Sequence, residues 1–83
     1  MTEVRGTIES VEAENNNGRE KKVVTLAMGR SDKIFIEFQG RASELVSKSM
    51  IEKNVSIRIV FNGKVSKLGR RYNNILGKSI KTL

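Results

Sequence analysis

The sequence predicts an all-β fold, a small β-barrel of five strands with one short helix, on three observations. Apolar and polar residues alternate along several short segments, as in strands that bury one face. One segment between the expected third and fourth strands changes to a period of three or four residues, which is typical of a helix. The 83-residue chain contains no proline, so no strand pairing is forbidden by a missing backbone N–H.

The first strand is expected over residues 4–13, where Val4, Gly6 and Ile8 share one parity. The parity of the apolar residues shifts after Ile8, which indicates a bulge or sharp bend, and Gly6 would ease close packing there. Residues 14–19 are rich in Asn and end in Gly-Arg, a composition that predicts a turn because Asn and Gly tolerate positive φ.

The second and third strands are expected over residues 21–28 and 33–39, separated by a turn at 29–32. Their buried faces would carry Val24, Leu26 and Met28, then Ile34, Ile36 and Phe38. Phe35 falls on the polar parity of the third strand, so we expect an aromatic ring on its outer face.

Residues 41–50 are expected to form the helix, with one apolar stripe of Ala42, Leu45, Val46 and Met50. A fourth strand follows over residues 55–62. Its alternation predicts Val55, Ile57, Ile59 and Phe61 inward, and Ser56, Arg58, Val60 and Asn62 outward. A loop over residues 63–70 leads into the last strand, residues 71–81.

The order strand, strand, strand, helix, strand, strand is that of the OB-fold, in which a small sheet closes into a barrel. The helix would plug the open end of that barrel, which helps a chain too short for a large core. Without internal repeats or a linker, residues 1–83 are expected to form a single OB-fold domain.

The net charge of +7 favours a polyanion as partner, and its distribution is uneven. Residues 55–83 carry seven Lys and Arg residues and no acid, whereas residues 1–14 carry four Glu residues against one Arg. The basic charge is therefore segregated toward the C-terminal part of the sequence.

The composition argues against an enzyme. The chain has no Cys and no His, which removes thiol nucleophiles, imidazole bases and the commonest zinc ligands. Glu9, Glu12 and Glu14 are better explained as a solvated strand face than as a metal site, and the glycines fit no nucleotide-binding fingerprint. We expect no catalytic residue, no cofactor and no metal.

The sequence contains no long apolar run and does not open on a charged segment followed by an apolar one. We therefore expect a cytoplasmic protein without a membrane partner, associated with the nucleoid, or in the host cytoplasm if it is viral.

OB barrels bind ligands with strands 2 and 3 and with the loops that join strands 1 to 2 and 4 to 5. Both loops are basic here, and cationic side chains that line a groove suit a phosphate backbone. Phe35 and Tyr72 are the aromatic residues placed to stack on bases. The predicted nucleic-acid-binding residues are Arg19, Lys21, Lys22, Phe35, Arg58, Lys64, Lys67, Arg70, Arg71 and Tyr72, of which Arg58 borders the groove.

Simpler interpretations stay open for each of these features. Either basic loop taken alone is compatible with a solvated surface. Phe35 either stacks on bases, packs under the loop between the first two strands, or lies in a subunit interface. Tyr72 either stacks on bases or is a half-buried strand residue with a solvated hydroxyl.

A family resemblance rests on Phe35-Ile36-Glu37-Phe38 before the helix, a strand ending at Phe61, a Lys/Gly loop, and Arg71-Tyr72 opening the last strand. In this pattern the chain resembles small OB-fold single-stranded-DNA-binding proteins, including phage and bacterial single-strand binders and primosomal-type OB proteins. The resemblance implies a role in DNA replication, recombination or repair, a homodimer or higher homo-oligomer, and contacts with replication or recombination proteins.

Two features depart from that family. The C-terminus is not the acidic tail of the bacterial members, which puts recruitment of partners by that route in doubt. Aromatic residues make up 5% of the chain and Trp is absent, so binding should depend on charge more than on stacking. Two alternatives to a DNA ligand stay open: RNA, and an acidic protein partner of an OB interaction module.

Overall fold

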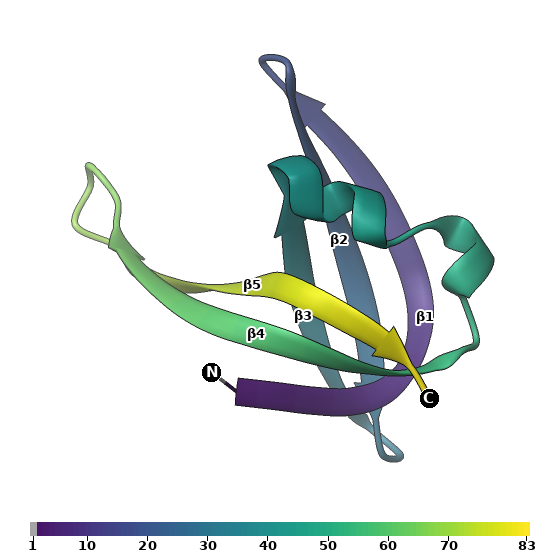
Figure 1. Cartoon of the computed structure of the whole chain (residues 1–83). Helices are drawn as coiled ribbons and strands as arrows, with labels where there is room; N and C mark the ends of the chain where they lie inside the picture. Colours follow the sequence, from purple (N-terminus) through teal and green to yellow (C-terminus); the bar gives the residue numbers. More distant parts are fainter. Residues whose placement is uncertain (1) are drawn as a thin grey trace.

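The computed structural model describes residues 2–83, which form a closed five-stranded barrel with the spatial strand order β1-β2-β3-β5-β4 (Figure 1). The strands are β1 (Thr2–Asn16), β2 (Arg19–Met28), β3 (Asp32–Gln39), β4 (Asn54–Val65) and β5 (Arg71–Thr82). β3 and β5 pair in parallel, and the other neighbours pair antiparallel. The predicted all-β barrel with OB-type element order is confirmed.

β1 bends sharply enough to serve two partners. Its first half pairs with β4 and its second half with β2, and the register with β2 shifts between Ile8 and Ser10. Ile8 and Val11 are both buried although their parities differ, which confirms the predicted break. Gly6 lies against the backbone carbonyl of Ala27, where a side chain would collide, so the expected close packing is also confirmed.

The turn between β1 and β2 is shorter than the sequence predicts. Asn17 and Gly18 both adopt positive φ, at 53° and 78°, as in the two-residue turns that match the twist of a hairpin. Both strands therefore continue up to the turn, and the β1–β2 hairpin extends beyond the barrel wall at the top of Figure 1.

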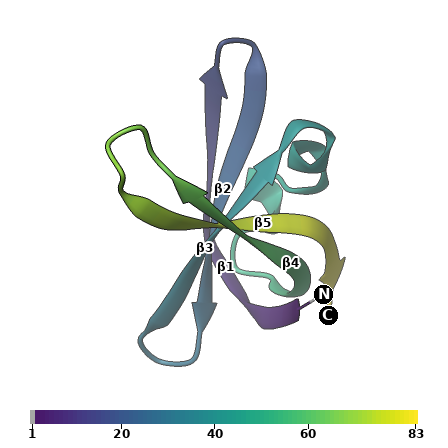
Figure 2. The same cartoon turned by 90° about the vertical axis from the view of Figure 1, so that its left-hand side faces the viewer.

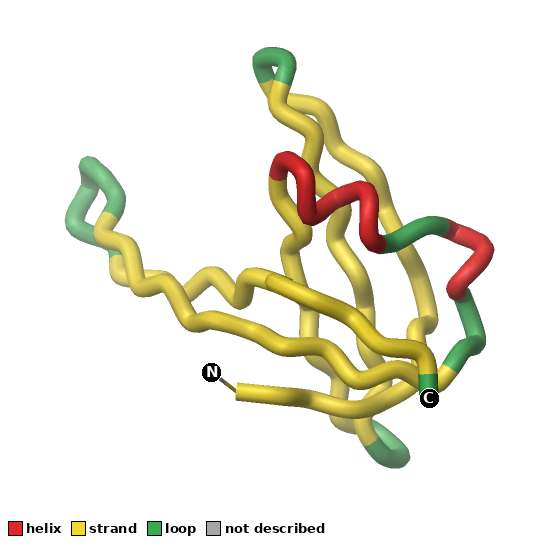
Figure 3. Tube along the Cα trace, viewed as in Figure 1, coloured by secondary structure: helices red, strands yellow, loops and turns green. Residues whose placement is uncertain are grey.

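The expected helix over residues 41–50 is wrong in type. Two 3₁₀ segments, η1 (Gly40–Leu45) and η2 (Lys48–Met50), flank an extended link at Val46, as Figure 3 shows in red and green. Extended backbone at Val46 turns that side chain into the barrel, where it is buried, while Leu45 stays 45% exposed. Ala42 and Met50 pack against the core, so the segment packs against the barrel without forming an α-helix.

No helix within residues 2–83 has the length and the apolar character needed to cross a membrane.

The core joins side chains from every strand and from the link after η1. Its buried apolar members are Ile8, Val11, Val24, Leu26, Ile36, Phe38, Val46, Val55, Ile57 and Ile59. Phe38 is the largest of them, and its ring lies directly beneath Gly77 of β5. The predicted inward positions of β4 are confirmed up to Ile59.

Phe61 is the exception, because it is 59% exposed although its parity matches Ile59. β4 and β5 continue past the barrel as a projecting two-stranded hairpin, so the inward face at Phe61 has no opposite wall to pack against (Figure 1). Ser56 deviates in the other direction: it is buried on the outer face, where its hydroxyl donates a hydrogen bond to the Glu3 carboxylate.

Gly77→Ala should lower the free energy of unfolding by about 1–3 kcal/mol, because the new methyl group would overlap the Phe38 ring. Urea denaturation measures this loss. Gly63→Ala in the same hairpin is the matched control, since a Cβ there meets only ordinary contact distances, and it should change stability by less than about 1 kcal/mol. Equal stability of the two variants would contradict the close approach at Gly77.

Candidate nucleic-acid interface

Two hairpins and η1 surround an open hollow of about 790 Å³. The hollow lies between the β1–β2 turn, the end of β3 with η1, and the projecting β4–β5 hairpin; Figure 2 views the molecule from the side to which that hairpin projects. Its lining residues are Gly18, Arg19, Glu20, Lys21, Gln39, Gly40, Arg41, Glu44 and Lys64. We call this hollow the basic groove.

Four cationic side chains line the basic groove against two carboxylates. Arg19 comes from the start of β2, Arg41 from η1 and Lys64 from β4, so segments distant in sequence bring them together. Arg19, Lys21 and Lys64 were expected here from the sequence, but Arg41 was not. Its place directly after Gly40, where the chain turns from β3 into η1, was the available indication.

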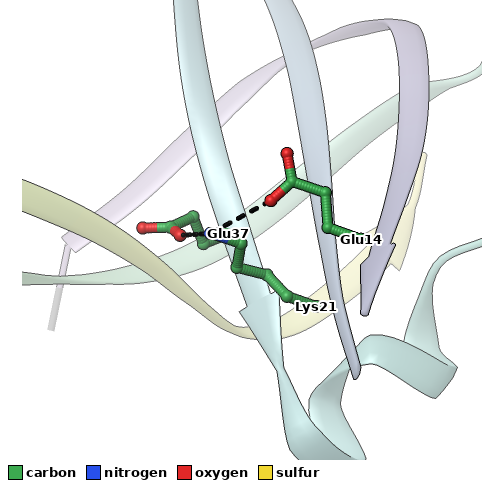
Figure 4. A network of polar contacts seen from close by, with 3 residues as sticks. All are labelled: Glu14, Lys21 and Glu37. Carbon is green, nitrogen blue, oxygen red and sulfur yellow. Dashed lines mark ion pairs between the residues drawn. The ribbon is translucent and has the colours of Figure 1, made fainter. Parts of the chain in front are cut away.

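Lys21 lines the basic groove, but its ammonium group already forms ion pairs with two carboxylates. Its Nζ atom lies 2.8 Å from Glu37 Oε1 and 3.2 Å from Glu14 Oε2 (Figure 4). The hydrogen bonds to Glu37 and then to Glu14 raise the pKa of Lys21 above its ordinary value. A phosphate would have to compete with two carboxylates for this ammonium group, so Lys21 contributes less to anion binding than its position suggests.

Lys22 projects to the opposite face of β2 and has a structural contact. Its Nζ atom donates a 2.8 Å hydrogen bond to the carbonyl of Val46 in the link between η1 and η2. Alternation along a strand separates neighbours in this way, so the predicted pair Lys21 and Lys22 cannot line one groove. The Lys22 contact instead holds the link that inserts Val46 into the barrel end.

Arg58 lies on the outer face of β4, beside Glu3 of β1 and outside the basic groove. The Ser56 hydroxyl lowers the pKa of Glu3 most strongly, and attraction to Arg5, Arg58 and Lys81 lowers it further. The structure therefore groups Arg58 with a second basic cluster, Arg5, Arg58 and Lys81, and not with the groove it was expected to border.

The tip of the β4–β5 hairpin presents Lys67, Arg70 and Arg71 to solvent. Ser66 orders this turn: its N–H donates to the Arg70 carbonyl at 2.8 Å, and its hydroxyl accepts from the Arg70 N–H at 3.1 Å. Tyr72 pairs directly with Lys64 across the hairpin, so both share one face, and Arg71 occupies the other. The tyrosine is 46% exposed, which places its ring at the surface beside the groove lysine.

Phe35 stands on the outer face of β3 and is 60% exposed. Packing under the β1–β2 loop, one of the interpretations left open by the sequence, is therefore excluded. The ring borders a second hollow of about 410 Å³ lined by Val23, Lys33, Ile34, Phe35, Glu37, Asn73, Asn74 and Ile75. Asn73 and Asn74 were not expected here, because nothing in a single sequence shows that β5 approaches β3 at this point.

The glutamates of β1 considered above as a metal site are Glu9, Glu12 and Glu14, and they do not form one cluster of carboxylates. Glu9 pairs with Lys33 at 2.9 Å and Glu14 pairs with Lys21, so two of the three carboxylates neutralise different lysines of the neighbouring strands. This arrangement favours the interpretation of a solvated strand face.

No protein-family model matches the chain, and no curated protein matches its sequence.

Lys22→Met should lower the free energy of unfolding by about 1–2 kcal/mol, because it leaves the Val46 carbonyl without its charged donor. Thermal or urea denaturation measures this change. Lys67→Met removes the same charge from the exposed hairpin tip and should leave stability within about 0.5 kcal/mol of the unmodified protein. If Lys67→Met costs as much as Lys22→Met, the structural role assigned to Lys22 is wrong.

Proposed function

We propose that this protein binds single-stranded DNA without catalysing a reaction and serves DNA replication, recombination or repair. The observation that carries the proposal is the convergence of Arg19, Arg41 and Lys64 on one open groove between two projecting hairpins. Cationic side chains in such a groove neutralise phosphates and release condensed counterions, which supplies affinity without base selectivity.

The strand would run along the basic groove and over the outer face of β3. Phosphates contact Arg19, Arg41 and Lys64, and further phosphates contact Lys67, Arg70 and Arg71 at the hairpin tip. Phe35 and Tyr72 expose rings on which unpaired bases can stack, each stack being worth about 1–3 kcal/mol. In a duplex the bases are already stacked on one another, so these rings favour a single strand.

An OB interaction module for an acidic protein is the second candidate. Phe61, Val65 and Leu68 are exposed apolar side chains on the same hairpin that carries Lys67 and Arg70. Base stacking does not explain the aliphatic side chains Val65 and Leu68, whereas a peptide with acidic and apolar residues would contact both the apolar and the basic side chains. Polyglutamate would then compete with an oligonucleotide at equal charge concentration, which the single-strand proposal does not predict.

Fluorescence anisotropy of a labelled single-stranded oligonucleotide, titrated over a series of salt concentrations, tests the proposal. With about four to six phosphates neutralised, log affinity should fall against log salt with a slope of about −3 to −4. The triple variant Arg19→Ala, Arg41→Ala, Lys64→Ala should make the slope shallower by about 2 and weaken binding about 10- to 100-fold at low salt.

The matched control is the triple variant Arg5→Ala, Arg58→Ala, Lys81→Ala, which removes the same charge from the cluster outside the groove. It should bind almost as tightly as the unmodified protein. Equal losses of affinity in both triple variants would mean that binding depends on net charge and not on the groove. An affinity independent of salt would also contradict the proposed groove. Duplex DNA and a matched RNA strand as competitors distinguish the ligand classes.

A further inference from the structure

The hollow beside Phe35 forms where β5 separates from β3. Within residues 2–83 these two strands are paired at one position, Glu37 with Leu76. Before that point β5 belongs to the projecting hairpin, which leaves the facing edges of the two strands apart (Figures 1 and 2). The volume of about 410 Å³ lies within the range of about 300–1,000 Å³ that is typical of small-ligand sites.

The walls of this hollow combine flat apolar surface with a polar edge. Val23, Ile34 and Ile75 are half-buried and supply apolar surface, and the exposed Phe35 ring supplies an aromatic face. Glu37 and Asn74 supply hydrogen-bonding groups. A planar ring with apolar faces and a polar edge fits such walls, and a nucleobase has that chemistry.

Register identifies the polar groups that share a face with Phe35. Glu37 lies two residues further along β3 and pairs with Leu76, and Asn74 lies two residues before Leu76. Alternation therefore places Phe35, Glu37 and Asn74 on one outer face. Asn73 has the opposite parity, and its Oδ1 atom lies over Gly63 across the hairpin.

The Glu37 carboxylate is held in place and is an acceptor only. Its side chain is 17% exposed, and one oxygen is fixed by Lys21 at 2.8 Å. Figure 4 shows the other oxygen pointing away from that ammonium group. The other charged residue of the hollow, Lys33, is paired with Glu9.

We propose that this hollow is a slot for one nucleobase, in which Glu37 and Asn74 select bases that carry an exocyclic amino group. Adenine, cytosine and guanine each offer an amino N–H to a carboxylate, whereas thymine and uracil offer one ring N–H between two carbonyl oxygens that repel it. The Asn74 amide, both donor and acceptor, completes the contact to the same edge. The inference rests on the proposed single-strand binding and adds base selectivity to it.

The test uses oligonucleotides with an abasic backbone and a single central base, so that the base can enter the slot whatever the register of the backbone. In anisotropy titrations the oligonucleotides with adenine, cytosine or guanine should bind about five- to tenfold more tightly than the one with thymine. Glu37→Gln and Asn74→Ala should each reduce this preference to less than about twofold. The slope against salt should stay unchanged in Asn74→Ala and become steeper by at most about 1 in Glu37→Gln, because that substitution leaves Lys21 paired with Glu14 alone.

Asn62→Ala is the matched control, because Asn62 pairs with Asn74 on the same hairpin face but does not line the slot. It should keep the full preference. Phe35→Ala should weaken binding of all four bases alike, since stacking does not depend on the amino group.

Equal affinity for all four bases, with each bound more tightly than the fully abasic backbone, would overturn the slot and leave single-strand binding intact. A preference that survives both Glu37→Gln and Asn74→Ala would also overturn it. If ordinary single-stranded oligonucleotides fail to bind even at low salt, the proposed function itself fails, and the slot fails with it.

Discussion

The contact between the Phe38 ring and Gly77 is the constraint on which the arrangement of this barrel depends. Phe38 is fully buried, and its ring occupies the space that any side chain at residue 77 would need. This approach lets β5 cross over β3 next to the pair of Glu37 and Leu76, which closes the barrel. Because closure uses so short a contact, the part of β5 that precedes Leu76 is free to leave the wall with β4.

That departure creates both candidate binding surfaces. The projecting β4–β5 hairpin carries Lys64 to the basic groove, opposite Arg19 and Arg41. The same departure opens the gap between β3 and β5 beside Phe35. In the proposed function the basic groove would take phosphates and the hollow beside Phe35 would take a base, so one feature of the closure would serve both kinds of contact.

The ion pairs distinguish lysines that are already paired with carboxylates from basic side chains that are open to an anion. Within residues 2–83, Lys21 of β2 forms ion pairs with Glu14 and Glu37. Lys33 of β3 forms an ion pair with Glu9. The cations at the rim of the groove and at the hairpin tip are not held in this way. Exposed ion pairs are worth at most about 1 kcal/mol each, so they contribute little to stability. In the proposed function the difference would act mainly on where a polyanion binds.

Much of the fold could be predicted from the sequence because alternation reports which side of a strand faces the core. The strands, the break after Ile8 and the exposure of Phe35 all follow from parity. Alternation does not report where the opposite wall ends, which is why Phe61 was placed inward. A stripe at three- to four-residue spacing also cannot distinguish an α-helix from two 3₁₀ turns joined by extended Val46.

The site was predictable in part for similar reasons. Basic residues near the two hairpin turns were identified, but Lys22 and Arg58 were included by proximity in sequence although the strands direct them elsewhere. Arg41 and Asn74 join their hollows only through tertiary approach, of η1 to the β1–β2 turn and of β5 to β3. A single sequence carries no local pattern for such contacts.

The most direct test of the account is a map of backbone amide chemical shifts in isotopically labelled protein during titration with a single-stranded oligonucleotide. A single strand bound in the basic groove should shift the amide signals of residues 18–21, 33–41, 64–67 and 70–74. Almost no shift is expected around Arg5, Arg58 and Lys81, which lie outside the groove. Shifts concentrated around Arg5, Arg58 and Lys81, or spread evenly over all basic residues, would contradict a binding groove built by the two hairpins.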